Sequence, residues 1–324
     1  MKKICAIIVT YNRKEYLINL IDKLINQDYK IDTILIYDNF SSDNTGNFLI
    51  NKGIIKNFIE LESTTNNYLD TNIIYFRNNF NSGGAGGFHD AMKLAMQSEF
   101  DYLWCMDDDV LPEKDCLSIM LDSLNSEIKM AIPSRNDSNF IDKPIIKVDL
   151  SNPFKIKSIK TGIDPTILKK NVIEVVDVAF EGPLISTELI KKIGYMDKNY
   201  FIFFDDTDFS YRASKYTKIN YCLKAKLHKQ IIPIVTKNRE YNWRDYYMIR
   251  NRIWFDMQNG ENYFVKNLRP ILFKYALLIK ATIQKNPKNK YIIKKSFYDA
   301  KNHNMGKTID PMKDVIYETK FKNR

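Results

Sequence analysis

Cysteine is scarce in this sequence, and its few copies are scattered. The four cysteines stand at positions 5, 105, 116 and 222, a spacing that fits neither a structural metal site nor a disulfide framework. Cys5 and Cys105 lie in hydrophobic segments that have the character of core strands. Such cysteines are typical of buried thiols in a reducing compartment, so we expect a cytoplasmic protein.

Long hydrophobic runs are missing as well. No stretch reaches the roughly 18 consecutive apolar residues of a membrane-spanning helix. Met1-Lys2-Lys3 precede a short apolar stretch, Ile4 to Val9, which predicts a first β-strand because it is too short for a signal peptide. Glycine (11) and proline (10) are infrequent, and 44% hydrophobic with 27% charged residues is typical of a globular protein with a sizeable core.

The net charge of +10 is distributed unevenly. Residues 214–324 contain 25 Lys and Arg against 8 Asp and Glu, a net charge of +17, which leaves −7 for residues 1–213. This asymmetry suggests different tasks for the two parts of the chain. The basic part could meet nucleic acid, anionic lipid or a phosphorylated substrate, and charge alone does not choose among them.

Hydrophobic runs and helical periodicity alternate along the first part of the chain. Continuous apolar runs at Lys3–Thr10 and Asp32–Asp38, and a shorter one at Asn72–Phe76, predict strands. Helical spacing follows the first run, at Leu17, Leu20, Ile21, Leu24 and Ile25. This order is typical of a mostly parallel sheet with helices on both faces. We also expect a helix that opens at Leu111-Pro112-Glu113 and runs to about Asn125.

Three adjacent carboxylates, Asp107, Asp108 and Asp109, end the apolar run that starts at Tyr102. Like charges this close resist desolvation unless a cation neutralises them. A solvated acidic turn is the alternative, but ligands of α/β sheets bind at the carboxyl ends of strands. The triplet therefore favours a site for Mg²⁺ or Mn²⁺ that shares its oxygen ligands with a diphosphate.

A glycine-rich segment, Asn81 to Gly87, contains four of the eleven glycines. It follows the third predicted strand and lacks the G-x-G-x-x-G spacing of a dinucleotide fingerprint. We expect a loop from Asn78 to Gly87 that lies beneath a sugar or phosphate, with a helix after it. A purely structural turn is the alternative.

A second acidic block follows the aromatic run Tyr200–Phe204. Helix capping explains one of Asp205, Asp206 and Asp208, and three acids within four positions indicate a catalytic role for one of them. His228 follows a predicted strand at Asn220–Leu223. On its own it would be an ordinary surface histidine, but beside carboxylates it is a plausible donor to Mn²⁺.

Taken in order, these blocks resemble the inverting family-2 glycosyltransferases of the GT-A fold, from Ile4 to about Trp254. Ile8–Arg13 is similar to the family's first nucleotide-binding turn, and Asp38–Thr45 to its second. The resemblance implies an α/β fold with a mostly parallel, Rossmann-like sheet flanked by helices. It also implies a catalytic domain over 1–235, with a nucleotide-sugar half to about 110 and an acceptor half from 111. Residues 236–324 would then form a basic, mainly helical extension.

The resemblance assigns a role to each candidate residue. The general base would be Asp206, with Asp205 in place of the family's usual glutamate. The ligands of Mn²⁺ or Mg²⁺ would be Asp107, Asp109 and His228. The nucleotide sugar would be bound by Thr10, Tyr11, Asn12, Arg13, Asp38, Asn81, Gly83, Gly84 and Asp108. The acceptor would meet Gly182, Asp205 and Trp243. The segment Tyr246–Trp254 is similar to a Y-Y-x-x-R-N-x-x-W block that follows many of these catalytic domains.

Asn81–Phe88 is most similar to the galactofuranosyltransferases, which implies UDP-galactofuranose as donor. Rhamnosyl- and other hexosyltransferases share most of the remaining blocks and stay open as alternatives. The implied acceptor is a glycan or a lipid-linked glycan in cell-surface polysaccharide synthesis, extended by a single sugar. A nucleotidyltransferase and a basic nucleic-acid-binding protein are more distant alternatives, and we expect no nucleic-acid partner.

The basic extension contains an apolar helical face at Ile271, Leu272, Tyr275, Leu278 and Ile279, with Lys274 and Lys280 beside it. A helix packed on the catalytic domain would explain this pattern. Basic amphipathic helices also bind anionic lipid surfaces. Peripheral attachment to the inner face of the cell membrane is therefore a second interpretation.

Overall fold

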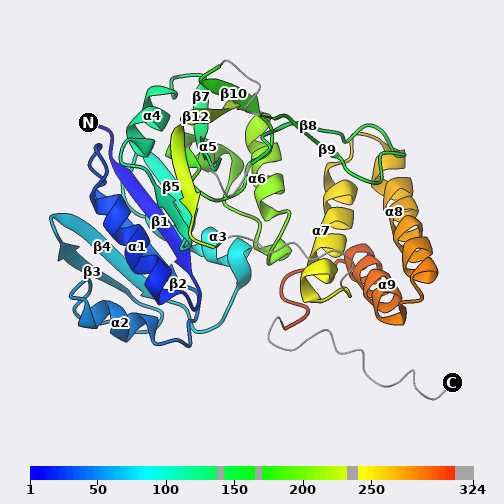
Figure 1. The fold of residues 1–324 in the computed structure, drawn as a ribbon, viewed down its shortest axis with the longest axis horizontal. Coiled ribbons are helices and arrows are strands. Elements are labelled where there is room, and N and C mark those ends of the chain that lie inside the picture. Colours follow the sequence, from blue (N-terminus) through cyan, green and yellow to red (C-terminus); the bar gives the residue numbers. More distant parts are fainter. Residues whose placement is uncertain (137–141, 165–169, 232–239, 311–324) are drawn as a thin grey trace. The chain divides into compact units, whose positions relative to one another are not determined.

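The computed structural model describes residues 1–136, 142–164, 170–231 and 240–310 (Figure 1). The chain divides into two compact units. The first comprises Met1–Lys147, Gly162–Asp197 and Asp206–Pro233, and the second comprises Val148–Thr161, Lys198–Asp205 and Ile234–Arg324. The domain boundary that the sequence predicts at residue 235 lies outside the described residues.

The first unit is built on a mixed sheet, in which the described residues supply ten strands (Figure 1). Their spatial order is β10 (Val172–Val175), β12 (Lys218–Lys229), β7 (Ile128–Ser134), β11 (Leu184–Ser186), β5 (Tyr102–Asp107), β1 (Ile4–Thr10), β2 (Thr33–Asp38), β4 (Thr71–Arg77) and β3 (Ser63–Tyr68). The tenth strand, β6 (Val110–Pro112), pairs with β12. A separate two-stranded sheet joins β8 (Ile145–Val148) and β9 (Lys160–Gly162).

The central strands β5, β1, β2 and β4 are parallel to one another, whereas the outer neighbours β11 and β3 pair antiparallel with β5 and β4. Both β1 and β2 are buried along their whole length, because helices cover a parallel sheet on both faces. This arrangement confirms the mostly parallel centre predicted from the hydrophobic runs. The helices of the first unit are α1 (Lys14–Ile25), α2 (Thr45–Asn51), α3 (Gly83–Ala95), α4 (Cys116–Asp122), α5 (Thr187–Ile193) and α6 (Asp205–Ser214), the last beginning at the unit boundary.

Two local predictions differ from the structure. The helix expected to run to about Asn125 is present as α4, but its predicted start at Leu111 is wrong, because Val110–Pro112 forms β6 and pairs antiparallel with β12 and α4 starts at Cys116. Pro112 fits a short strand since proline is tolerated where a strand needs no further N–H donor. The sequence analysis also missed β3, whose residues STTNNY are mostly polar. An edge strand needs only one buried face, so its hydrophobic signal is weak.

Three long α-helices lie among the described residues of the second unit, α7 (Trp243–Asn259), α8 (Tyr263–Ile283) and α9 (Pro287–Lys301). They confirm the helical extension that the resemblance implies. A capping box, in which Asn242 and Asp245 satisfy each other's backbone N–H groups, starts α7. Apolar side chains from all three helices form one cluster, which includes Ile253, Ala281 and Ile293. None of the described helices is long and apolar enough to cross a membrane.

Candidate active site

Neighbouring parallel strands of the first unit end together at one edge of the sheet. Thr10 at the end of β1 lies opposite Asp38 at the end of β2, and Asp38 lies opposite Arg77 at the end of β4. On the other side of β1, Asp107 at the end of β5 lies opposite Val9. The carboxyl ends of parallel strands are where α/β sheets bind ligands. The two predicted nucleotide-binding turns and the acidic triplet are therefore neighbours.

Asp108 organises the first of these turns from beneath. Its buried carboxylate accepts hydrogen bonds from the Thr10 hydroxyl at 2.7 Å, the Tyr11 N–H at 3.3 Å and Arg13 Nη1 at 3.0 Å. Arg13 Nη1 also lies 2.9 Å from Asp109 Oδ2. Arg13 thus neutralises two of the three carboxylates. Asp108 holds the turn through its hydrogen bonds with the Thr10 hydroxyl and the Tyr11 N–H.

The triplet still concentrates negative charge at the sheet edge. Burial raises the pKa of Asp108 to about 6, although Arg13 and Thr10 act in the opposite direction. The pKa of Asp107 lies well above its usual range, first because of burial and then because of the nearby charges of Glu181, Asp109 and Asp108. A bound cation would relieve this repulsion.

The chemistry of the carboxylates fits Mg²⁺ or Mn²⁺. Within the described part of the chain, the Asp107 carboxylate makes no hydrogen bond, and Asp109 contacts Arg13. The described residues contain no ready-made group of three or more His, Cys, Asp or Glu for a metal. Mg²⁺ needs only one or two carboxylates when substrate phosphates complete its shell, so Asp107 and Asp109 would suffice.

His228 is not brought to the triplet. Its Nε2 lies 2.9 Å from Glu113 Oε1, beside the pairing of β12 with β6. The side chains of neighbouring residues in a strand point to opposite faces. The side chain of Lys229, the next residue of β12, therefore points to the face opposite to that of His228. Lys229 Nζ lies 2.7 Å from Glu181 Oε1, and its charge lowers the pKa of Asp109 against the larger effect of burial.

Glu181, which was not among the predicted site residues, lies close enough to the triplet for its charge to raise the pKa of Asp107. Arg135 Nη1 lies 2.7 Å from Glu181 Oε2, and Lys229 holds its other oxygen. Burial alone would raise the pKa of Glu181, but the charges of Arg135 and Lys229 lower it overall. The available signal was an acid directly before the Gly182-Pro183 pair, but the cationic partners of Glu181 come from two distant strand ends.

Gly182 has a packing role in this structure. Its N–H donates to the Cys105 carbonyl at 2.9 Å, and its carbonyl accepts from Trp104 Nε1 at 2.9 Å. Its φ of +98° is a conformation that favours glycine, and a Cβ would stand 2.8 Å from Pro133 Cγ. Gly182 thereby fixes Glu181 against β5, while the acceptor contact implied by the resemblance stays a prediction.

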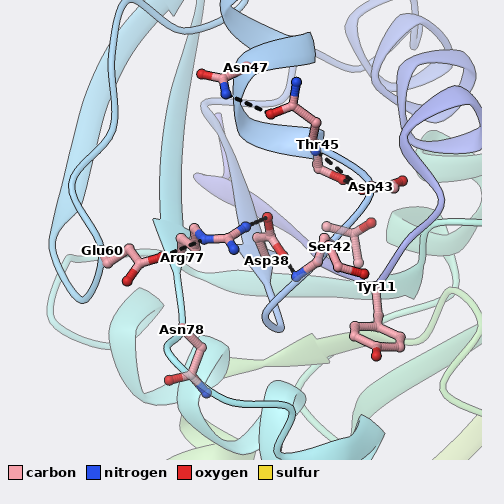
Figure 2. Close-up of polar contacts among 12 residues, drawn as sticks. Tyr11, Asp38, Ser42, Asp43, Thr45, Asn47, Glu60, Arg77 and Asn78 are labelled. Carbon is pink, nitrogen blue, oxygen red and sulfur yellow. Dashed lines mark hydrogen bonds and ion pairs between the residues drawn. The ribbon is translucent and has the colours of Figure 1, made fainter. Parts of the chain in front are cut away.

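The second predicted nucleotide-binding turn is built around the polar contacts of Asp38 (Figure 2). The Asp38 side chain is fully buried. Its Oδ1 accepts from the Ser41 N–H at 2.7 Å, and its Oδ2 accepts from the Tyr75 hydroxyl at 2.7 Å and from Arg77 Nη1 at 3.2 Å. Arg77 also binds Glu60 through Nε at 3.0 Å. Arg77 was not among the predicted site residues, although its place at the end of a strand made it a candidate.

Asn12 connects the two turns. Its side-chain Oδ1 accepts from the backbone N–H groups of Ser42 at 2.6 Å and Asp43 at 3.2 Å, while its own N–H donates to Ser41 Oγ at 3.0 Å. Its φ of +57° is tolerated by asparagine better than by most residues. The loops after β1 and β2 are therefore one hydrogen-bonded surface.

The glycine segment forms the start of α3, so the loop expected as far as Gly87 ends at Ser82. Asn39 fixes this start, because its Oδ1 accepts from the Ser82 N–H at 3.0 Å and its Nδ2 donates to the Gly83 carbonyl at 2.9 Å. Asn81 Oδ1 accepts from the Gly83 N–H at 2.8 Å. A Cβ at Gly84 would meet no atom within 4 Å, whereas one at Gly87 would stand 2.7 Å from Val9 Cγ1. Packing against Val9 therefore explains why residue 87 is glycine, whereas packing does not explain the glycine at position 84.

Asp206 occupies the first turn of α6. Its Oδ1 accepts from the neighbouring Thr207 N–H at 2.7 Å, and it forms no ion pair with any described residue. Asp208, in contrast, is paired with Arg212 at 2.8 Å. One turn after Asp206, Phe209 packs edge-to-face on Phe180 with ring centroids 5.2 Å apart. Because Phe180 precedes Glu181, α6 is anchored to the segment that borders the acidic triplet.

The loop before α6 belongs to the second unit and is strained. Phe201, Phe203 and Phe204 all have φ of +66°, a conformation that bulky residues rarely adopt. Asn251 Nδ2 lies within 2.9 Å of the carbonyl oxygens of Tyr200, Ile202 and Phe203. Asp205 ends this loop. Trp243, at the start of α7, packs edge-to-face on Tyr247 in the same unit.

Comparisons with known proteins identify the family of this chain. The family model described as Glycosyl transferase family 2 matches residues 5–177. Galactofuranosyltransferase GlfT1 of Mycolicibacterium smegmatis is 24% identical over 208 residues, which are 63% of this chain and 63% of that protein. Abequosyltransferase RfbV of Salmonella typhimurium is 33% identical over 133 residues, 40% of this chain and 35% of that protein. The chain spans less than two thirds of either relative.

Solved structures share the fold. GalNAc-T7 with UDP, GalNAc and Mn²⁺ superposes with a TM-score of 0.60 at 12% identity, covering 94% of this chain and 58% of that one. Mannosyltransferase PcManGT from Pyrobaculum calidifontis, in complex with GDP-Man and Mn²⁺, gives 0.52 at 12% identity, covering 94% and 87%. S. aureus TarS 1-349 with UDP-GlcNAc gives 0.51 at 16% identity, covering 92% and 81%. The chain belongs to Glycosyl transferase family 2 and has the GT-A fold.

Proposed function

We propose that this protein is a metal-dependent, inverting glycosyltransferase that moves one sugar from a UDP-sugar to a glycan or lipid-linked glycan in cell-surface polysaccharide synthesis. The observation that carries the proposal is the convergence of both nucleotide-binding turns and the acidic triplet at one sheet edge. Family membership removes the nucleotidyltransferase and nucleic-acid-binding alternatives, since neither accounts for a family-2 domain.

The best candidate for the donor is UDP-galactofuranose. The segment Asn81–Phe88 and the relative named as a galactofuranosyltransferase support this choice. The relative named as an abequosyltransferase favours the second candidate, a rhamnosyl- or other hexosyltransferase. Neighbours whose complexes contain UDP or UDP-GlcNAc support uridine as the nucleoside of the donor.

The donor would lie across the sheet edge. Tyr11, Asn12 and Asp38 would border the nucleoside, and the start of α3 at Gly83 and Gly84 would lie beneath the sugar or phosphates. Mg²⁺ or Mn²⁺, held by Asp107 and Asp109 with the donor's diphosphate, would neutralise the charge that develops on leaving UDP. Arg13 would release Asp109 when the donor enters. His228 would become a third ligand only by leaving Glu113.

Asp206 is proposed as the general base. An acceptor hydroxyl is a poor nucleophile at neutral pH, so a carboxylate should take its proton as the new bond forms. The Asp206 carboxylate is held by Thr207 and by no described cation, which leaves it able to accept that proton. Attack from the face opposite to departing UDP inverts the sugar carbon, without a covalent sugar–protein intermediate.

A donor panel tests this function. The protein is incubated with Mn²⁺ and separately with UDP-galactofuranose, UDP-galactopyranose, UDP-GlcNAc, dTDP-rhamnose and GDP-mannose, and release of the nucleotide is measured. Slow, metal-dependent hydrolysis of UDP-galactofuranose above the others is expected. Preference for a different nucleotide sugar would replace the donor assignment, and hydrolysis of none, with no binding of UDP in the presence of Mn²⁺, would contradict the proposal.

A further inference from the structure

Helix α8 carries two apolar stripes on opposite faces. Successive residues of an α-helix turn by about 100°, so positions two apart face nearly opposite directions. One stripe, which includes Val265, Phe273 and Ala281, packs into the core of the second unit. The other stripe follows the four-residue spacing Ile271, Tyr275, Ile279 and Ile283, with exposed fractions of 40%, 54%, 61% and 77%.

Among the described residues of the second unit, no hydrophobic cluster includes the outer stripe. A helix of a water-exposed surface usually has polar residues opposite its buried face. In α8 the face opposite to the buried one is apolar instead. Tyr263 and Phe264 add two exposed aromatic residues at the first turn of the helix. Contiguous exposed apolar surface of this kind marks a surface that contacts another molecule or a membrane.

The surface around the stripe is positively charged. The sequence of α8 contains no acidic residue, and α9 contains only Asp299, which is buried and bound to Lys295. Helices α8 and α9 pack side by side (Figure 1). A groove of about 590 Å³ beside them is lined by Lys274, Lys294 and Lys301 together with aromatic side chains. None of these three lysines has an acidic partner among the described residues.

One of these lysines is held in place by aromatic rings. Lys274 Nζ lies 4.4 Å from the ring centroid of Tyr275 and 4.3 Å from that of Phe297. Such contacts fix an ammonium group without neutralising its charge. The groove therefore presents the Lys274 ammonium group at a defined position, with Lys294 and Lys301 in the same lining.

We propose that the α8–α9 surface binds an anionic phospholipid bilayer. Helix α8 would lie in the plane of the membrane surface, with Ile271, Ile279 and Ile283 among the acyl chains and the groove lysines at the lipid phosphates. The apolar stripe distinguishes a bilayer from nucleic acid or free phosphate, because neither of these takes up isoleucine side chains. This inference does not rest on the proposed function.

Vesicle flotation tests the inference with the full chain. Vesicles of phosphatidylcholine alone are compared with vesicles that also contain phosphatidylglycerol, at low and high salt. The protein is expected to float with the anionic vesicles and to dissociate as salt rises, because surface charges are screened. Absence of binding to anionic vesicles at low ionic strength would overturn the proposal.

Paired variants separate the two contributions. Ile279→Glu is expected to weaken vesicle binding about tenfold or more, since an apolar group no longer inserts. The matched control Ile59→Glu, at a site 55% exposed in the first unit, should bind like the wild type. Lys294→Gln and Lys301→Gln should each weaken binding about fivefold, and Lys30→Gln should not.

Three results would contradict the proposal, provided that circular dichroism shows folded variants. If Ile279→Glu keeps full vesicle binding while the lysine variants lose it, the stripe does not insert. If the wild type is a dimer in solution and Ile279→Glu is a monomer, the stripe faces a second copy of the chain. Equal losses for Ile279→Glu and Ile59→Glu would show a nonspecific effect. Nucleotide-sugar hydrolysis in solution should be unchanged in Ile279→Glu, so failure of the transferase assignment would be seen separately.

Discussion

The side-chain amide of Asn251 donates to the carbonyl oxygen of Phe203 at 2.9 Å, and Phe203 stands three residues before Asp206. Phe203 has φ of +66°, as does Phe204. Backbone strain of this size costs on the order of 1–3 kcal/mol per residue and persists only where surrounding contacts impose it. Asn251 supplies such contacts, and the restrained loop leads directly into the helix that carries Asp206.

Arg250, the neighbour of Asn251, restrains the same loop. Its Nη2 lies 3.0 Å from the Tyr200 carbonyl, and its Nη1 lies 2.8 Å from the Gly306 carbonyl. The R-N pair of the Y-Y-x-x-R-N-x-x-W block therefore has a physical purpose. It sets the conformation of the aromatic run that leads into α6, and the first turn of α6 carries Asp206, the proposed base.

We predict that Asn251→Ala lowers turnover by about tenfold to a hundredfold, because small displacements of a catalytic group have effects of that size. The loss of buried hydrogen bonds should also lower the free energy of unfolding by about 1–3 kcal/mol. Steady-state kinetics and UDP titration check this, with donor affinity expected to be unchanged. Asn267→Ala is the control, since that asparagine is exposed on α8. Wild-type turnover in folded Asn251→Ala would refute the positioning role.

A glycine pair distinguishes a ligand surface from a structural turn. Gly84→Ala introduces a methyl group where 4 Å of space is open, and alanine stabilises a helix by up to about 1 kcal/mol relative to glycine. We predict an unchanged or higher melting temperature together with donor binding weakened about tenfold, because the methyl group would meet the sugar or phosphate.

Gly87→Ala is the matched variant of the same helix. Its methyl group would stand 2.7 Å from Val9 Cγ1, and overpacking of this kind typically costs about 1–3 kcal/mol. Its main effect should therefore be a lower melting temperature. If calorimetry finds that Gly84→Ala binds UDP and the UDP-sugar as the wild type does, the segment is a packing element only.

The centre of the sheet could be predicted because the evidence for each of its strands lies within the residues of that strand. The runs that became β1, β2 and β5 are hydrophobic without interruption, and such runs report burial on both faces of a parallel sheet. β6 could not be recognised in this way. Its three residues are stabilised by pairing with β12, which lies more than a hundred positions further along the chain.

The charged partners of the site could not be predicted for a related reason. Composition shows that acids cluster, but which cation meets which acid depends on tertiary structure. Arg13 bridging Asp108 and Asp109, and Lys229 binding Glu181, join segments far apart in sequence. His228 and Lys229 are adjacent in sequence and point to opposite sides of β12, so a shift of one position in the assignment of a strand exchanges their roles.

Asp299 gives the second unit a pH-dependent stability. Burial alone would raise its pKa, but hydrogen bonds from Tyr246, Lys295 and Asn304 lower it overall. Because the pKa of Asp299 is lower in the folded than in the unfolded protein, its ionised form stabilises the fold at pH values above the unfolded pKa of about 3.8. This stabilisation is lost as the pH falls through the folded-state pKa. Asp299→Asn should lower the melting temperature at pH 7, and its difference from the wild type should shrink below pH 3.8. A difference that is independent of pH would contradict this account, and exposed Asp122→Asn is the control.

Metal removal tests the acidic triplet. Excess EDTA should abolish transfer and Mn²⁺ should restore it. Asp109→Asn keeps a hydrogen-bond acceptor for Arg13 but loses the charge that a hard cation requires, so UDP titrations should need at least about tenfold more Mn²⁺ while the melting temperature stays close to that of the wild type. His228→Ala serves as the comparison, because the imidazole contacts Glu113 in this structure. Full activity in excess EDTA would refute the metal assignment, and an equal shift in His228→Ala would return histidine to the ligand set.

Asp206→Asn tests the chemistry itself. The amide is nearly isosteric with the carboxylate. Its Oδ1 can still accept the hydrogen bond from the Thr207 N–H at the start of α6. It cannot take a proton from the acceptor hydroxyl. Donor binding should therefore stay unchanged while transfer falls about 10²–10⁴-fold, the usual contribution of general-base catalysis. Asp122→Asn, on the exposed end of α4, should retain wild-type transfer.

NMR of the product should show inversion at the transferred sugar carbon. Transfer by Asp206→Asn at nearly the wild-type rate would move the base to another carboxylate, and a product with retained configuration would overturn single-step displacement, because retention requires a second inversion or a different path.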